Sequence, residues 1–225
     1  MKIRSRQPEL IDLGSEHYTQ HEYNHCLYQL GRIGKYLGAN NAILKTFPHN
    51  INSILDVGCG GGYFAMQLAL KFKNAQVTGI DLNSDAITHA IKQNAHLNNI
   101  KFLLSKTPEL NEPEKSYDIV TATLVCHHLS DEEIIDFLKR AKVVARKNII
   151  INDLQRSRVS YFFASIIMPL FFNNRLVKND SLLSIKKAFT YSDWIFYLKA
   201  AGISPSNYSI RWHWPFRWII KINVV

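Results

Sequence analysis

The side chains with the clearest chemistry follow two apolar strands in the first half of the chain. Residues 54–62 read Ile-Leu-Asp-Val-Gly-Cys-Gly-Gly-Gly, so an apolar strand passes directly into a glycine-rich turn, and a second apolar strand, 76–80, precedes an aspartate. Glycines let the backbone approach a ligand closely, and an acid at the tip of the next strand can bind ribose hydroxyls. The pattern predicts a nucleoside-cofactor site, in which the first aspartate orders the loop or reaches the ligand through water. Its candidate residues are Asp56, Gly58, Gly60, Gly62 and Asp81.

A second group of reactive side chains follows two later strands. The strand that ends at Leu124 precedes His127 and His128, and Asp153 follows the next strand. Ligands bind at the carboxyl ends of the strands in an open parallel sheet, and a histidine placed there can remove a proton from a substrate. We predict a catalytic role for His128 first, with His127 and Asp153 as further candidates. A structural role, as a helix cap or packed beneath a loop, is an equal alternative for the histidines. Asp153 could position the acceptor or hold the loop at Asn152, with the structural role slightly ahead.

The elements that position these residues alternate between strand and helix from residue 51 to about residue 153. Apolar strands that alternate with helices indicate an α/β fold with a parallel sheet covered on both faces. The expected strands are 53–57, 76–80, 100–104, 117–124 and 148–152, and the expected helices are 63–72, 131–145 and one that Asn83 or Ser84 caps.

Residues 1–50 are predicted to form an N-terminal helical extension that caps the substrate, ahead of a cofactor-binding domain at 51–225. The glycine and asparagines at 38–41 are expected to end its helix. The apolar face of that helix has the spacing of one helical stripe and consists of Tyr23, Leu27, Leu30, Ile33 and Leu37.

Residues 156–187 are predicted to be an insertion that covers the substrate. Their apolar run, 159–172, is 14 residues long, which is too short to span a bilayer. A buried core helix is the equal alternative. A helix from Tyr191 and two strands, 209–214 and 218–225, are expected to close the fold. The insertion residues expected to line an apolar pocket are Phe162, Phe163, Ile166 and Phe171.

Composition limits the number of domains and the classes of protein and site that the chain could represent. The chain has 225 residues, 47% of them hydrophobic, which suits one domain. Three scattered cysteines lack metal-ligand spacing, so neither a disulfide framework nor a metal is predicted. His17, His21 and His25 would share one helix face if the helix starts early, and without acidic or cysteine companions this face indicates a polar lid rather than a metal site. The first residues contain no apolar signal segment, which predicts a cytoplasmic protein.

Charge is distributed unevenly along the chain. Residues 1–138 carry 12 Lys/Arg against 15 Asp/Glu, whereas residues 139–225 carry 15 against 3. Such an asymmetry predicts an anionic partner, which could be nucleic acid, acidic lipid or an acidic substrate. A basic solvated face without a partner is an equal alternative.

These motifs together resemble the class I superfamily of methyltransferases that use S-adenosylmethionine (SAM). The resemblance covers residue 51 to the C-terminus and includes Leu-Asp-Val-Gly-Cys-Gly-Gly-Gly, Gly-Ile-Asp, Tyr-Asp-Ile-Val and Val-Cys-His-His-Leu-Ser-Asp. Pro8-Glu9-Leu10-Ile11-Asp12 and the run 151–157 resemble a bacterial branch found with polyketide-type biosynthesis, which is similar in turn to quinone-biosynthesis methyltransferases.

The resemblance implies a Rossmann-like sheet of seven mostly parallel strands with an antiparallel final strand. It implies SAM as cofactor and S-adenosylhomocysteine as product. The glycines would pack against the methionine and ribose portions, Asp81 would bind the ribose, and Leu82 would lie against the adenine. Leu124, at the end of a later strand, is a further candidate for cofactor binding. Many members place an acid after the third strand, but this chain has Ser105 and Lys106 there, so the Ser105 hydroxyl or a backbone amide near Lys106 would bind the adenine.

The predicted activity is methyl transfer to a small aromatic or lipophilic acceptor, with O-methylation slightly ahead of C-methylation. The apolar insertion and the aromatic run 212–218 further predict contact with a membrane surface. Two alternatives stay open: an RNA methyltransferase that uses the basic C-terminal half, and a SAM-binding partner protein without catalysis.

Overall fold

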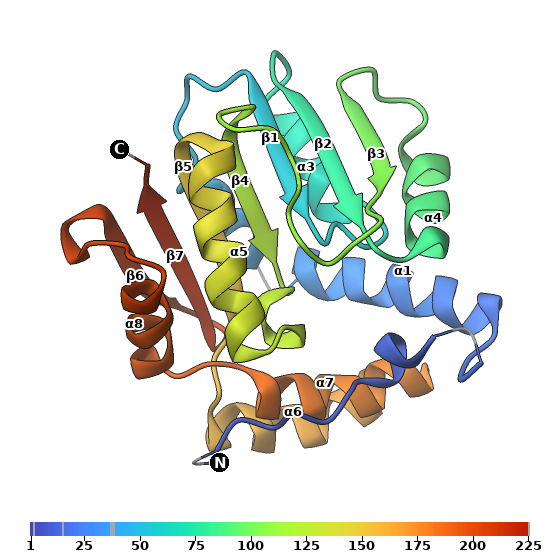
Figure 1. Ribbon diagram of the computed structural model, residues 1–225. Coiled ribbons are helices and arrows are strands. Elements are labelled where there is room, and N and C mark those ends of the chain that lie inside the picture. The colour runs from blue at the N-terminus through green and yellow to red at the C-terminus, as the bar shows by residue number, and fades with distance from the viewer. Residues whose placement is uncertain (2, 15, 37–38, 225) are drawn as a thin grey trace.

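The computed structural model describes residues 1, 3–14, 16–36 and 39–224. Its strands form one seven-stranded sheet in the order β3-β2-β1-β4-β5-β7-β6 (Figure 1). Among these strands, β7 alone runs opposite to the others and pairs antiparallel with both β5 and β6, so the predicted fold class is confirmed. The strands are β1 (Ser53–Val57), β2 (Gln76–Asp81), β3 (Ile100–Leu104), β4 (Tyr117–Thr123), β5 (Ala145–Leu154), β6 (Tyr208–His213) and β7 (Arg217–Asn223).

Helices and short 3₁₀ turns connect the strands. Polar side chains start several of them: Asn83 accepts hydrogen bonds from the amides of Asp85 and Ala86 at the N-terminus of α4, which confirms the predicted cap. The elements are η1 (Leu10–Leu13), α1 (Gln20–Tyr36), α2 (Ala39–Leu44), α3 (Tyr63–Lys71), α4 (Ser84–Asn94), η2 (Cys126–His128), α5 (Asp131–Val144), α6 (Arg158–Phe171), α7 (Arg175–Lys187), α8 (Tyr191–Ala200) and η3 (Pro205–Asn207).

Successive strand residues point to opposite faces of the sheet, and both faces are buried beneath helices. Leu55 and Ile149 pack with α5 and α8 on one face. Ile54 and Ile150 pack with α2, α3 and α4 on the other. This two-sided burial explains why the strands read as continuous apolar runs in the sequence.

A third layer of helices lies beyond the carboxyl ends of the parallel strands. Figure 1 shows α1, α6 and α7 there, with the N-terminal segment running along α7. Tyr23 and Leu27 of α1 pack against Leu176 and Val177 of α7. Within the described residues, 156–187 fold as α6 and α7, and α7 closes this layer against α1. No separate helix was predicted within residues 175–187.

The N-terminal extension is helical as predicted, but it contains two helices. Tyr23 and Leu27 are buried in α1. Leu37 and Gly38, where the first helix was expected to end, lie outside the described residues. Ala39 already belongs to α2, so the asparagines at 40 and 41 do not terminate the helical region as predicted. His17 precedes α1, so the proposed three-histidine helix face is not formed.

Candidate active site

The turn after β1 adopts a backbone that glycine favours. Gly60 has φ of +51°, and a Cβ there would meet no atom within 4 Å, so this backbone faces open space. Gly58 has φ of +66°, and a Cβ there would lie 2.5 Å from a methyl group of Val125. Gly58 therefore allows the loop to pack against the end of β4, while Gly60 leaves the backbone accessible to a ligand.

Asp81, the last residue of β2, holds this turn in place. Its Oδ2 accepts a hydrogen bond from the Gly60 amide at 2.8 Å, and its Oδ1 accepts one from the Asn83 amide at 2.9 Å. Each carboxylate oxygen can accept more than one hydrogen bond. The same side chain can therefore order the loop and still accept hydrogen bonds from a bound diol.

A cavity of about 960 Å³ opens at the carboxyl ends of β1, β2 and β4. Six of the predicted cofactor-binding residues line it, whereas Asp56, Gly62 and the exposed Lys106 do not. The predicted residues in its wall are Gly58, Gly60, Asp81, Leu82, Ser105 and Leu124. The cavity lies where the strand order reverses between β1 and β4, which is the general position for ligands in such sheets.

Several cavity residues were not anticipated. Thr107, Pro108 and Leu110 line it from the segment after β3, and Tyr23 and Leu27 line it from α1. The segment after β3 has no periodic pattern, so its sequence offered no signal. Tyr23 and Leu27 did carry a signal, the apolar stripe of α1, but this stripe serves both the core and the cavity wall.

His128 faces the cavity and is paired with an acid from the N-terminal segment. Its Nδ1 lies 2.9 Å from Oδ2 of Asp12, which also lines the cavity. Burial opposes the charged imidazole, but the hydrogen bond to Asp12 and the charges of Glu9 and Asp12 raise the pKa of His128 above its ordinary value. Burial likewise opposes the charged form of Asp12, yet His128 and Lys187 lower the pKa of that carboxyl to about 2. The two side chains form a hydrogen-bonded dyad suited to proton transfer.

His127 and Asp153 form a separate, buried pair behind the cavity wall. His127 Nδ1 lies 2.7 Å from Asp153 Oδ1, and the His127 amide donates to Oδ2 at 3.2 Å. Complete burial would raise the pKa of Asp153, but the charge and hydrogen bond of His127 lower it. Neither residue lines the cavity. Of the three predicted catalytic residues, the structure places only His128 where it can touch a ligand in this cavity.

Comparison with known proteins identifies the domain. A family model described as "Methyltransferase domain" matches residues 54–148, which contain the glycine turn, Asp81 and both histidines. Residues 54–148 are therefore a methyltransferase domain of the SAM-dependent type. Its predicted relation to quinone-biosynthesis enzymes is confirmed by sequence relatives. The chain is 32% identical over 117 residues to "Ubiquinone biosynthesis O-methyltransferase" of Photobacterium profundum. The aligned region covers 50% of this chain and 48% of that protein.

Solved structures share the methyltransferase fold over most of the chain. A SAM-dependent methyltransferase from Aquifex aeolicus has a TM-score of 0.68 at 18% identity and covers 90% of this chain and 98% of that one. Human N-acetylserotonin methyltransferase in complex with SAM has a TM-score of 0.71 at 12% identity, with 97% and 63% covered. These likenesses concern the fold. The chain spans about half the length of the curated relatives it matches first.

An unpaired buried carboxylate lies beneath the cofactor side of the methyltransferase site. Asp56 is 1% exposed and its Oδ2 has no hydrogen-bond partner among the described residues. Burial and the charge of Asp81 raise the pKa of Asp56 to about 8. An orphaned acceptor of this kind is costly, so it fits a site whose ligand brings a donor or a positive charge. The residues present therefore fit SAM.

The N-terminal segment packs across the His128 side of the methyltransferase site, opposite the glycine turn. Arg4 donates to Asp131 at 3.0 Å and to the backbone oxygen of Leu129 at 2.6 Å, and its guanidinium lies over the Phe189 ring. Glu9 is 2% exposed and accepts a hydrogen bond from Ser184 of α7 at 2.9 Å. These contacts hold Asp12 against His128.

Glu9, His127 and His128 bring three potential metal ligands within 4.8 Å of one another. A cation is already present beside them, because the Lys187 ammonium lies 3.3 Å from Glu9 Oε1 and 3.4 Å from Asp12 Oδ2. The His127 Nδ1 is also engaged by Asp153. We interpret the group as an ion-pair network that supports the dyad.

The expected apolar lining from the insertion is not found. Phe162, Phe163, Ile166 and Phe171 are exposed, and none of them lines the cavity. That expectation was wrong because α6 is separated from the cavity by α7, which packs against η1, η2 and α1. Leu27, Leu30, Val125 and Phe137 supply apolar cavity wall instead.

Proposed function

We propose that the protein is a SAM-dependent methyltransferase that methylates a small aromatic or lipophilic acceptor, preferentially on oxygen. The observation that carries the proposal is the Asp12–His128 dyad, which faces the same cavity as the glycine turn and Asp81. One cavity thus presents a cofactor-binding edge and a proton acceptor. SAM, when bound, supplies the activated methyl group, so the protein has to align the acceptor, remove its proton and exclude water.

His128 is the proposed general base. With its Nδ1–H donated to Asp12, the neutral imidazole leaves Nε2 as the acceptor for a hydroxyl proton. Nε2 makes no hydrogen bond in the described part of the chain, and Glu9 Oε2 lies 3.9 Å from it. Asp12 stabilises the imidazolium that forms after proton transfer. His127 and Asp153 are proposed as positioning residues, because they fix the turn that carries His128.

We assign contacts with the cofactor to the residues that line the cavity. Backbone at Gly58 and Gly60 would approach the methionine and ribose portions, and Asp81 would accept from the ribose hydroxyls. Leu82 and Ser105 would contact the adenine. Asp56 is buried behind the wall, so it would order the loop or reach the amino end of the cofactor through water. Lys106 and Gly62 lie outside the wall, so we assign them no contact with SAM.

Preference for oxygen is supported by the relatives. The proteins similar to this chain include ubiquinone biosynthesis O-methyltransferases from several bacteria. A phenolic hydroxyl gains from a base of the His128 type, which also supports an aromatic acceptor. C-methylation of an acidic carbon is the second candidate, because the same base would serve it.

A lipophilic acceptor partitions into bilayers, so contact with a membrane surface belongs to the proposal. An RNA substrate is the less favoured alternative, supported only by the basic C-terminal half. A SAM-binding partner protein without catalysis is the other alternative. A cytoplasmic location stays a prediction, and the residues 1–50 and 156–187 are proposed to form the substrate-side cover through η1, α1 and α7.

Transfer of a labelled methyl group from SAM to a panel of acceptors tests the proposal. The panel contains hydrophobic catechols, matched catechol ethers that lack a free hydroxyl, and bulk RNA. We expect methylation of the catechols only, with SAM binding measured separately by calorimetry. SAM binding together with methylation of RNA alone would overturn the acceptor class, and absence of SAM binding would overturn the enzyme itself.

A further inference from the structure

The solvent-facing side of α6 is apolar along its whole length. Ser160 and Ala164 are buried on the packed side of this helix. The opposite side carries large apolar residues at helical spacing, each between 40% and 73% exposed. An isolated surface helix normally shows the reverse pattern, with polar residues toward solvent. The exposed residues are Val159, Phe162, Phe163, Ile166, Ile167, Leu170 and Phe171.

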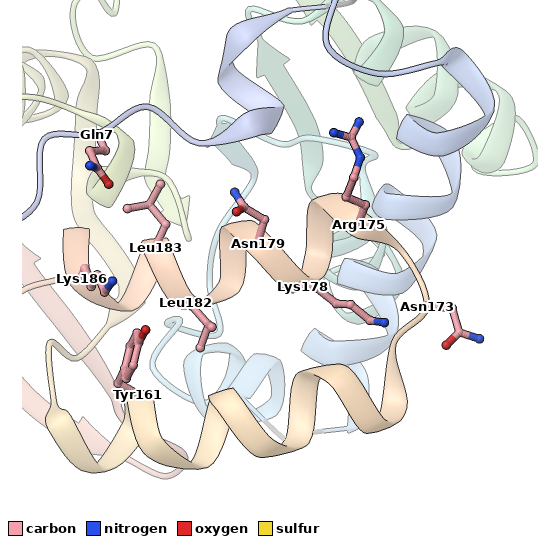
Figure 2. Close-up of a pocket in the computed structure, with 9 residues that line it drawn as sticks. All are labelled: Gln7, Tyr161, Asn173, Arg175, Lys178, Asn179, Leu182, Leu183 and Lys186. Carbon is pink, nitrogen blue, oxygen red and sulfur yellow. The ribbon is translucent and has the colours of Figure 1, made fainter.

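A cationic groove runs beside this apolar face. A hollow of about 610 Å³ is lined by Arg175, Lys178 and Lys186 of α7 and by Tyr161 of α6. Figure 2 shows Tyr161 pointing from α6 toward α7. Arg175 pairs with Glu22, whereas Lys178 makes no ion pair with any described residue, and Lys186 lies 5.0 Å from the Tyr161 ring centroid. No carboxylate lines the groove in the part of the chain that the structure describes. The groove is therefore suited to anionic groups.

Exposed tryptophans lie next to the start of α6. Trp212 and Trp214, in the β6–β7 hairpin, are 49% and 61% exposed. The hairpin is joined to the segment before α6, because the Gln155 amide donates to the backbone oxygen of Phe216 at 2.8 Å and the Trp212 indole donates to the Gln155 side chain at 2.9 Å. Tryptophan and lysine beside an apolar helix face are typical of the boundary between lipid headgroups and acyl chains.

We propose that α6 docks onto an anionic phospholipid bilayer and lies in its interface. The apolar face enters the boundary of the acyl chains, and Lys178 and Lys186 contact the lipid phosphates. The charge of the molecule fits this partner, since residues 139–225 carry 15 Lys/Arg against 3 Asp/Glu. Among the described helices none is long and apolar enough to cross a membrane, so the contact is peripheral.

Docking through α6 would bring the acceptor side of the molecule toward the lipid. Figure 1 shows α6 and α7 at the carboxyl-end side of the sheet, where the cavity opens. The N-terminal segment and α7 connect α6 to His128: α6 packs against α7, and Ser184 and Lys187 of α7 contact Glu9 and Asp12. This inference specifies the membrane contact of the proposed function. Its test needs neither SAM nor an acceptor, so its failure would leave methyl transfer unaffected.

Co-sedimentation of the full chain with phosphatidylcholine vesicles, with and without phosphatidylglycerol, tests the docking. We expect binding to the anionic vesicles that weakens with salt. The double variant Phe162→Ser, Ile166→Ser should reduce partitioning at least about tenfold. The matched control is Phe196→Ser on α8, because Phe196 and Phe162 are both 60% exposed; it should bind as the wild type does.

A double lysine variant tests the contribution of the groove independently of the apolar face. Lys178→Gln with Lys186→Gln should weaken binding to anionic vesicles about 10- to 30-fold, whereas Lys139→Gln with Lys142→Gln on α5 should not. Three results would each overturn the proposal: no vesicle binding by the wild type, equal losses in test and control variants, or a dimer in sedimentation equilibrium that the α6 double variant dissociates.

Discussion

The cofactor side and the acceptor side of this methyltransferase site are built in different ways. On the cofactor side, consecutive strand ends supply the parts, and the bond from the Gly60 amide to Asp81 crosses 21 residues of sequence. On the acceptor side, His128 meets Asp12 across 116 residues, and Glu9 meets Ser184 across 175. The first side is a property of the sheet, whereas the second exists only when the N-terminal segment and α7 are folded against the sheet.

This difference predicts that substitutions separate into two kinds. Changes on the cofactor side should alter the affinity for SAM, and changes on the acceptor side should alter turnover. A substitution that changes SAM affinity and turnover equally would contradict this separation into two sides.

His128→Gln is expected to have the largest effect. Loss of a general base lowers turnover by about 100-fold or more, while SAM affinity should stay unchanged because His128 contacts only the acceptor side. Steady-state kinetics and calorimetry measure the two quantities. His96→Gln, an exposed histidine in the loop after α4, is the control. Unchanged kcat in the His128 variant would remove the proposed base.

Asp81→Asn is expected to weaken SAM binding about 10- to 100-fold. The carboxylate holds the Gly60 and Asn83 amides, and hydrogen bonds to a charged group contribute about 1.5–3 kcal/mol each. At saturating SAM, kcat should recover, since the dyad is intact. Glu114→Gln, at an exposed position, provides the matched loss of one negative charge. A variant with normal SAM affinity would show that Asp81 orders the loop without touching the cofactor.

On the cofactor side, the sequence indicated six residues that line the cavity, because these parts are local, but it also indicated Asp56, Gly62 and Lys106, which do not line it. An apolar strand, its glycines and the next strand-end acid are close along the chain, and parallel pairing brings them to one edge. The sequence was insufficient for the acceptor side. Asp12 appeared only within a branch motif, and nothing in its surroundings indicated His128 as its partner. The exposed face of α6 has the composition of a core helix, so periodicity alone could not distinguish a buried helix from one whose apolar face is exposed to solvent.

Asp12→Asn is expected to lower kcat about tenfold and to shift its pH profile. The base works when neutral, so activity rises with pH through the pKa of His128. Asp12 and Glu9 raise that pKa, so removing the Asp12 charge should move the rising limb to lower pH. A merely structural role for Asp12 would reduce activity without moving the limb. Glu16→Gln, exposed in the same segment, should leave the profile unchanged.

Asp56→Asn is expected to have the smallest effect, on stability without ligand. The pKa of Asp56 is about 8 in the folded protein against an ordinary value of 3.8. Between these values the folded state binds the extra proton, so the free energy of unfolding of the wild type falls as pH rises from about 4 to about 8. The variant lacks this contribution, so its stability relative to wild type should increase over that range by about 1 kcal/mol or more.

Denaturant unfolding of both proteins across that range, with Glu114→Gln as the charge control, measures the difference in slope. Identical slopes would mean that Asp56 is ionised and paired in solution. SAM binding by the same Asp56 variant then decides its role. Weaker binding would place the carboxylate against the amino end of the cofactor, whereas unchanged binding would assign it to the loop alone.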